Sequence, residues 1–129
     1  MVLIDVTLGD LVDRLTILEL KAARRPDRFG EHLARLRDAL PVHFDTDLLT
    51  ELRAINAELW DVEDRIRALI AAGDYGNDFI DVALAVPRLN DARARARARV
   101  DGDDLDDKLY NAGGGPGHAR GGPGHAGTA

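Results

Sequence analysis

Residues 47–72, DLLTELRAINAELWDVEDRIRALIAA, contain the regular pattern that decides the fold class. Large apolar residues recur there at alternating intervals of four and three positions: Leu48, Leu52, Ile55, Leu59, Val62, Ile66 and Leu69. Such a heptad pattern places the apolar side chains along one side of an α-helix, which then packs against another helix. The stretch therefore predicts a long helix that ends before Gly73. The pattern leaves open whether the other helix belongs to the same chain or to a second copy.

Apolar periodicity predicts two helices before this stretch and one after it. Residues 8–25 form a helical stripe with Thr7 as the expected N-cap, residues 27–40 form a shorter one, and another begins at about residue 77. Pro87 lies inside the last helix, so we expect that helix to be kinked or broken there and to resume to about residue 100. The fold class predicted is all-α, a small antiparallel helical bundle or long helical hairpin of about four helices.

The C-terminal segment differs in composition from the rest of the chain. Beyond Asn111 the sequence consists almost entirely of Gly, Pro, His and Ala, with Gly-Pro-Gly-His-Ala written twice. Such a segment buries too little apolar surface to offset its chain entropy. We therefore predict a helical domain at residues 1–111 and a disordered tail at residues 112–129.

Composition excludes several classes of function. The 129 residues are 45% hydrophobic and 31% charged, which suits a single domain. The chain contains no Ser, no Cys and no Gln, so serine and cysteine nucleophiles are excluded. No glycine cluster precedes a lysine as a phosphate-binding loop requires. The N-terminus has no basic leader and no apolar run is long enough to span a bilayer, so we expect a cytoplasmic protein with no membrane association.

The charge balance argues against nucleic acid as a partner. The formal net charge is −6, whereas nonspecific nucleic-acid binding depends on neutralising phosphates. The exception is a basic run that contains Arg93, Arg95, Arg97 and Arg99. Successive residues of a helix point in different directions, so these arginines are not expected to form one basic face.

A polar stripe lies beside the apolar seam of the long helix. Asn56, Trp60, Glu63 and Arg67 are spaced four, three and four apart, so they share one side of the helix. Two interpretations stay open. In the structural one, Trp60 packs at the edge of the core and Glu63 pairs with Arg67. In the functional one, the stripe is the wall of a polar pocket in which Arg67 binds an anion.

Paired carboxylates offer an alternative of a different class. Glu58 with Asp61, and Asp78 with Asp81, are acids three residues apart that on facing helices could hold magnesium, as in magnesium-dependent phosphohydrolases. Such acids are also common on solvated helix surfaces, and an upstream acidic motif of those enzymes is missing. His32 and His43 have no second imidazole at ligand spacing, so no metal site and no cofactor is predicted there.

Three segments resemble a family of short bacterial proteins of unknown function. They are residues 8–21 (LGDLVDRLTILELK), residues 55–67 (INAELWDVEDRIR) and residues 90–93 (NDAR). Family members contain N-x-x-L-W-x-x-E-D-x-I-R and N-D-x-R motifs. They sometimes lie beside, or are fused to, glycosyltransferases of surface polysaccharide pathways.

The resemblance implies which polar positions matter. It puts weight on Asp13, Thr16, Glu19 and Lys21 in the first helix, and on a candidate ligand-binding set further along the chain: Asn56, Trp60, Glu63, Asp64, Arg67, Asn90, Asp91 and Arg93. This chain departs from the family at Pro87, where a tyrosine is usual, and at Ala71, where an acid is common. If either residue acts in the family's function, this member has lost it.

Together these observations predict a helical accessory or interaction module. Its partner is expected to be a protein, a second copy of the chain, or a small anionic ligand bound by the polar stripe. A magnesium-dependent phosphohydrolase that uses the helix carboxylates is the alternative, so enzymatic activity stays open.

Overall fold

The structure is a computed structural model that describes residues 1–41 and 46–102. Its described part consists of four helices: α1 (Leu8–Arg24), α2 (Pro26–Ala39), α3 (Thr46–Ala71) and α4 (Asn77–Asp101). The all-α prediction is confirmed. The predicted tail at residues 112–129, its boundary at residue 111, and His43 lie outside the described residues.

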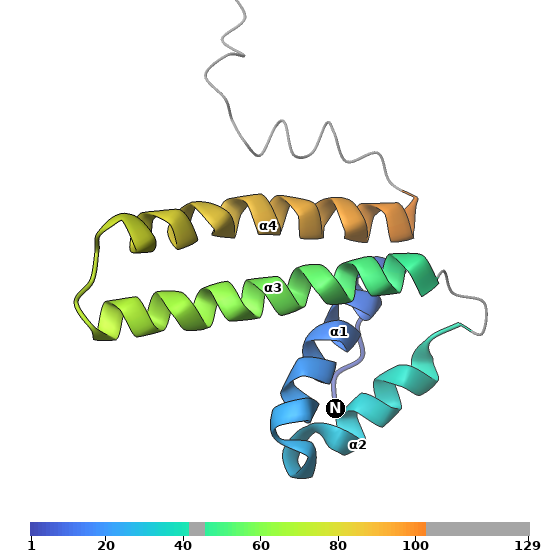
Figure 1. The fold of residues 1–129 in the computed structure, drawn as a ribbon. Coiled ribbons are helices and arrows are strands. Elements are labelled where there is room, and N and C mark those ends of the chain that lie inside the picture. The colour runs from blue at the N-terminus through green and yellow to red at the C-terminus, as the bar shows by residue number, and fades with distance from the viewer. Residues whose placement is uncertain (42–45, 103–129) are drawn as a thin grey trace, which may run out of the picture.

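The helices form two hairpins of unequal length. α3 and α4 lie side by side and antiparallel, whereas the shorter α1 and α2 form a V that meets one end of that long hairpin (Figure 1). α1 contacts each of the other three helices. The site described below is therefore built around α1, at the end of the long hairpin where α3 begins and α4 finishes.

Local sequence signals explain where the helices begin and end. The Thr7 hydroxyl accepts a hydrogen bond from the Asp10 backbone N–H, as expected for an N-cap. Pro26 starts α2 because its missing N–H costs nothing in the first turn of a helix. Gly73 and Gly102, with φ of 66° and 71°, follow α3 and α4 in the left-handed conformation that glycine adopts without strain.

The core consists of two apolar clusters that meet along α1. One fills the V between α1 and α2 and contains Leu15, Leu18, Ala22 and Leu33. The other joins α1, α3 and α4 and contains Val12, Leu52 and Ala96. Of the seven seam residues of α3, only Leu52 and Leu59 are buried, and the other five are half-buried. The heptad therefore identified the packing side of α3, while self-association stays a prediction.

α4 is continuous through Pro87. The helix runs from Asn77 to Asp101 with the proline inside it, so the break that was one of the two expected outcomes does not occur. Pro87 is exposed, while Val82 and Leu89 on either side of it are buried. Packing of these flanking residues compensates for the hydrogen bond that the proline cannot donate.

Gly9 lies where α1 comes closest to α4. Its backbone N–H donates a 2.7 Å hydrogen bond to the Asp101 carboxylate. A Cβ at position 9 would lie 2.6 Å from the Arg97 carbonyl oxygen, which is closer than side-chain carbons approach backbone oxygens. The absence of a side chain at Gly9 thus allows the contact that sets α1 across the end of the long hairpin.

Candidate functional site

A buried polar network joins α1, α3 and α4. Asp13 and Thr16 of α1 and Asn56 of α3 are 4%, 0% and 4% exposed. The Asn56 amide donates hydrogen bonds of 2.9 Å to Asp13 Oδ1 and 2.7 Å to Thr16 Oγ1. The Thr16 hydroxyl in turn donates to the Asp13 backbone carbonyl at 2.8 Å.

Arg93 of α4 completes this network with a two-point ion pair. Its Nε and Nη2 donate to the two carboxylate oxygens of Asp13 at 2.8 and 2.6 Å. The hydrogen bonds to Asp13 raise the pKa of the Arg93 guanidinium above its ordinary value; burial acts in the opposite direction, and the charges of Asp13 and Glu63 add to the rise. Arg93 therefore stays a cation, and its charge is matched by Asp13.

Two further ion pairs surround the network. Arg97 of α4 pairs with Asp10 of α1, one turn from Arg93. Arg53 of α3 donates to both carboxylate oxygens of Glu19 on α1, at 2.8 and 3.1 Å. Because these contacts have defined donors and acceptors, they fix the register of the three helices as well as holding them together.

A cavity of about 210 Å³ lies against this network, where α1, α3 and α4 meet. Its lining combines the apolar residues Ile17, Leu20, Leu59 and Trp60 with the polar residues Asn56, Glu63 and Arg93. Asn56 uses its amide N–H groups within the network, while its carboxamide oxygen accepts no hydrogen bond from the described residues. Two of the lining residues, Asn56 and Glu63, therefore carry hydrogen-bond acceptors.

Trp60 lines the cavity and has an unused hydrogen-bond donor. Its indole Nε1 is buried, and among the side-chain polar atoms of the described residues it is the one buried atom with no hydrogen-bond partner. The guanidinium carbon of Arg24 lies 4.4 Å from the centre of the indole ring, a cation–π contact. Arg24 also donates to the Leu20 carbonyl at 3.3 Å and forms no ion pair with the described residues.

Comparison with protein families gives a match over residues 2–114, most of the chain. The chain belongs to DUF6165, a family of unknown function. Among curated proteins none matches it, and none of the solved structures does. The DUF6165 match agrees with the resemblance to an uncharacterised family, while the link of that family to glycosyltransferases stays a prediction.

The structure of this DUF6165 member brings four of the eight candidate ligand-binding residues together. Asn56, Trp60, Glu63 and Arg93 all line the cavity, although Arg93 is 37 positions after Asn56 in the sequence. The other four do not line it. Arg67 pairs with Asp64 at 3.0 Å and with Glu63 at 3.9 Å on the exposed surface of α3, and Asn90 and Asp91 are exposed on α4.

The spacing of residues along α3 does not predict the other residues of the site. Asp13 and Thr16 were singled out only by the family resemblance, and they prove to be the buried partners of Asn56 and Arg93. Arg24, Ile17 and Leu20 reach the site because α1 crosses α3 at this point. That crossing is a tertiary property which no local pattern contains.

The carboxylates proposed for magnesium do not come together as a cluster. Within residues 1–41 and 46–102, no three acidic or histidine side chains are grouped closely enough to share a metal ion. Glu58 instead forms a 3.5 Å ion pair with Arg88 on the surface. The same ranges contain no helix that is long and apolar enough to cross a membrane.

Proposed function

We propose that this chain is a non-enzymatic binding module whose cavity between α1, α3 and α4 holds a small anionic ligand. The ligand has an oxyanion, such as a carboxylate, and at least one hydrogen-bond donor, as hydroxy acids and amino acids have. The proposal develops the polar pocket that was predicted from the sequence, and its polar lining residues are Asn56, Trp60, Glu63 and Arg93.

The buried indole N–H of Trp60 is the observation on which the proposal rests. A buried donor without a partner costs about 1–3 kcal/mol. Because Nε1 is buried, a ligand oxygen reaches it only when the indole shifts towards the cavity. Accepting a hydrogen bond from Nε1 then removes this cost and favours binding.

The charges around the cavity support an oxyanion near Trp60 and Arg24 and a hydrogen-bond donor near Glu63 and Asn56. Arg24 stacks on the indole and has no carboxylate partner among the described residues, so its charge is available to a ligand. The charge of Arg93 is already matched by Asp13. Glu63 and the Asn56 oxygen are acceptors, and they favour a ligand hydroxyl or ammonium.

The size of the cavity limits the ligand. Sites for drug-sized molecules enclose about 300–1,000 Å³. A cavity of about 210 Å³ is smaller, and suits a molecule of a few carbons or a single side chain of a partner protein. Nucleotides and nucleotide sugars are too large for it.

Trp60 is the single tryptophan of the chain, so its fluorescence reports on this cavity alone. The experiment is a fluorescence titration with lactate and with leucine, repeated on Arg24→Gln and on Arg65→Gln. We expect Arg24→Gln to weaken binding about fivefold to tenfold, because a hydrogen bond to a charged group is lost. Arg65→Gln removes the same charge from an exposed residue of α3 that does not line the cavity, and is the matched control.

Two further probes distinguish a free small molecule from a partner protein as the source of the carboxylate. Isobutyrate has the carboxylate but no donor, and is expected to bind more weakly than lactate. A blocked aspartyl peptide presents the carboxylate as a partner protein would, and a preference for it over lactate assigns the cavity to a protein side chain. Equal losses in Arg24→Gln and Arg65→Gln, or no binding of any probe, would contradict the proposal.

The wider setting of the module stays a prediction. We expect it in the cytoplasm, with either a partner protein, such as a glycosyltransferase of a surface polysaccharide pathway, or a second copy of the chain. The half-buried seam residues Val62, Ile66 and Leu69, towards the free end of the α3–α4 hairpin, are consistent with such contacts.

A further inference from the structure

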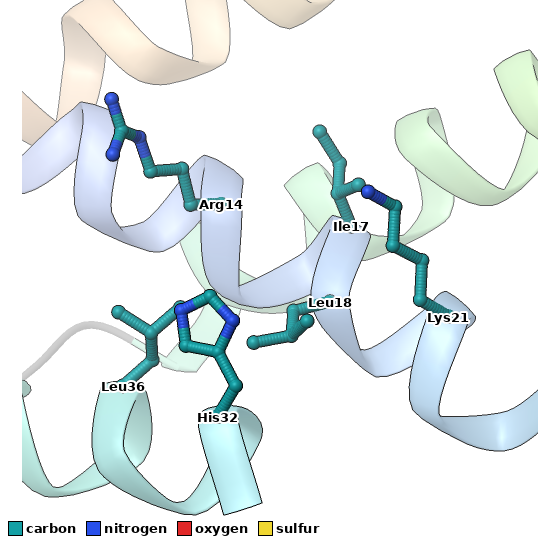
Figure 2. Close-up of a pocket in the computed structure, with 6 residues that line it drawn as sticks. All are labelled: Arg14, Ile17, Leu18, Lys21, His32 and Leu36. Atoms are coloured by element: carbon teal, nitrogen blue, oxygen red, sulfur yellow. The ribbon is translucent and has the colours of Figure 1, made fainter. Parts of the chain in front are cut away.

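A second cavity of about 200 Å³ lies between α1 and α2. Its lining consists of Arg14, Ile17, Leu18 and Lys21 from α1 and His32 and Leu36 from α2. In Figure 2, the imidazole of His32 and the side chain of Leu36 project from α2 toward α1, where Leu18 meets them, while Arg14 and Lys21 stand on opposite sides. None of these residues except Ile17 lines the Trp60 cavity.

The polar residues around this second cavity are all basic. Within residues 1–41 and 46–102, no acidic residue lines it. The side chains of Arg14 and His32 form no ion pair or hydrogen bond with the described residues. Lys21 forms no ion pair with them either, and its ammonium lies 5.7 Å from the centre of the Phe29 ring.

These unpaired charges contrast with the rest of α1. Asp10, Asp13 and Glu19 on the same helix each pair with an arginine of α3 or α4. No ion pair of Arg14, Lys21 or His32 with the described residues holds α1 in place. α2 packs on α1 through Leu18, Ala22 and Leu33, and Lys21 adds its cation–π contact with Phe29.

We propose that the cavity between α1 and α2 is a binding site for a small organic anion with an apolar body, such as an aromatic or branched carboxylate or phosphate ester. The apolar body packs on Ile17, Leu18 and Leu36. The anionic group lies within the field of Arg14 and Lys21, which no acid among the described lining residues offsets, and it accepts a hydrogen bond from the His32 imidazole. This site is separate from the Trp60 cavity, where Glu63 and Asn56 instead favour a ligand with a donor.

The test is an NMR titration of the full chain with benzoate, phenyl phosphate and isovalerate, observing the His32 imidazole and the Leu18 and Leu36 methyl groups. We expect saturable shifts at these groups and little change at the Trp60 indole. Benzamide, which has the same ring without the charge, is expected to bind at least about tenfold more weakly, since it loses a charge-assisted hydrogen bond.

Variants that remove a charge test which residues bind the anion. Arg14→Gln and Lys21→Gln are each expected to weaken benzoate binding about fivefold to tenfold. Arg35→Gln removes the same charge from α2, one position before Leu36 and outside the lining, and is expected to leave the affinity within about twofold. All three variants should fold normally, because none removes an ion pair of the described residues.

Three results would overturn this proposal. They are benzamide binding as tightly as benzoate, Arg35→Gln weakening binding as much as Arg14→Gln, and the absence of shifts at His32 with all three anions up to about 10 mM. A failure here leaves the proposed function intact, because that is read from the Trp60 signal and from different ligands.

Discussion

Arg93 of α4 binds the carboxylate of Asp13 in α1 through two hydrogen bonds, Nε to Oδ1 at 2.8 Å and Nη2 to Oδ2 at 2.6 Å. Oδ1 also accepts from Asn56 of α3, so one buried carboxylate is shared by three helices. Removing one member of such a pair leaves the other charge buried without a partner.

Asp13→Asn tests the pair with little change of shape. We expect the free energy of unfolding to fall by about 3 kcal/mol, since half-buried Arg93 loses its counter-charge at the buried position 13. Urea denaturation measures the loss. Glu58→Gln removes one acid of an exposed pair and is expected to change stability by less than about 0.5 kcal/mol. Similar small effects in both variants would show that the buried pair contributes no more than a surface one.

The raised pKa of Arg93 fixes the pH dependence of its contribution. Its pKa is higher in the folded chain than in the unfolded chain, so the stabilisation is complete below the unfolded pKa and is lost only as the pH rises above it. The stability difference between the wild-type chain and Arg93→Met should therefore be the same at about pH 7 and about pH 10. A difference that shrinks by half at the higher pH would mean that the guanidinium is not held in its charged form.

Gly9 and Gly30 are a matched pair of helical glycines. Gly9→Ala should lower the free energy of unfolding by about 1–3 kcal/mol, because the new Cβ would lie 2.6 Å from the Arg97 carbonyl oxygen. Gly30→Ala has no atom within 4 Å of the new Cβ and should raise it by about 0.5–1 kcal/mol through helix propensity. Thermal or urea unfolding measures whether each variant is more or less stable than the wild-type chain. Equal changes in the free energy of unfolding for the two variants would refute the close approach of α1 and α4.

Pro87 is expected to cost stability without breaking α4. Pro87→Ala restores a backbone donor at an exposed position of the helix, so the free energy of unfolding should rise by about 1–3 kcal/mol. Amide exchange of the neighbouring residues should slow in the variant. A loss of stability on this substitution would indicate instead that the proline ring makes a contact the helix depends on.

Part of this arrangement could be predicted from the sequence because it depends on local periodicity. The heptad of α3 gave the packing side of that helix, and the spacing of Asn56, Trp60 and Glu63 placed these residues together on the wall that now lines the cavity. The predicted continuation of the last helix to about residue 100 is confirmed, since α4 ends at Asp101. Fold class therefore follows from spacing and propensity alone.

The remaining features depend on how the helices cross. Asp13 and Arg93 are 80 positions apart, and their charges alone did not indicate which of many acids and arginines would pair. The arginines of the basic run pair with acids that are distant in sequence: Arg93, Arg97 and Arg99 pair with Asp13, Asp10 and Glu51 of α1 and α3. Arg24 likewise reaches Trp60 only through the α1–α3 crossing.

The indole N–H of Trp60 gives the most direct measurement of the central claim, that the cavity beside the Asp13–Arg93 pair binds a ligand. The chain has one tryptophan, so its indole N–H gives a single, unambiguous cross-peak in a ¹H–¹⁵N NMR spectrum. On titration with lactate, the proposal predicts a saturable downfield shift and slower solvent exchange of this proton as a ligand oxygen accepts from it. An indole signal that stays unchanged at saturating lactate, leucine and aspartyl peptide would contradict it.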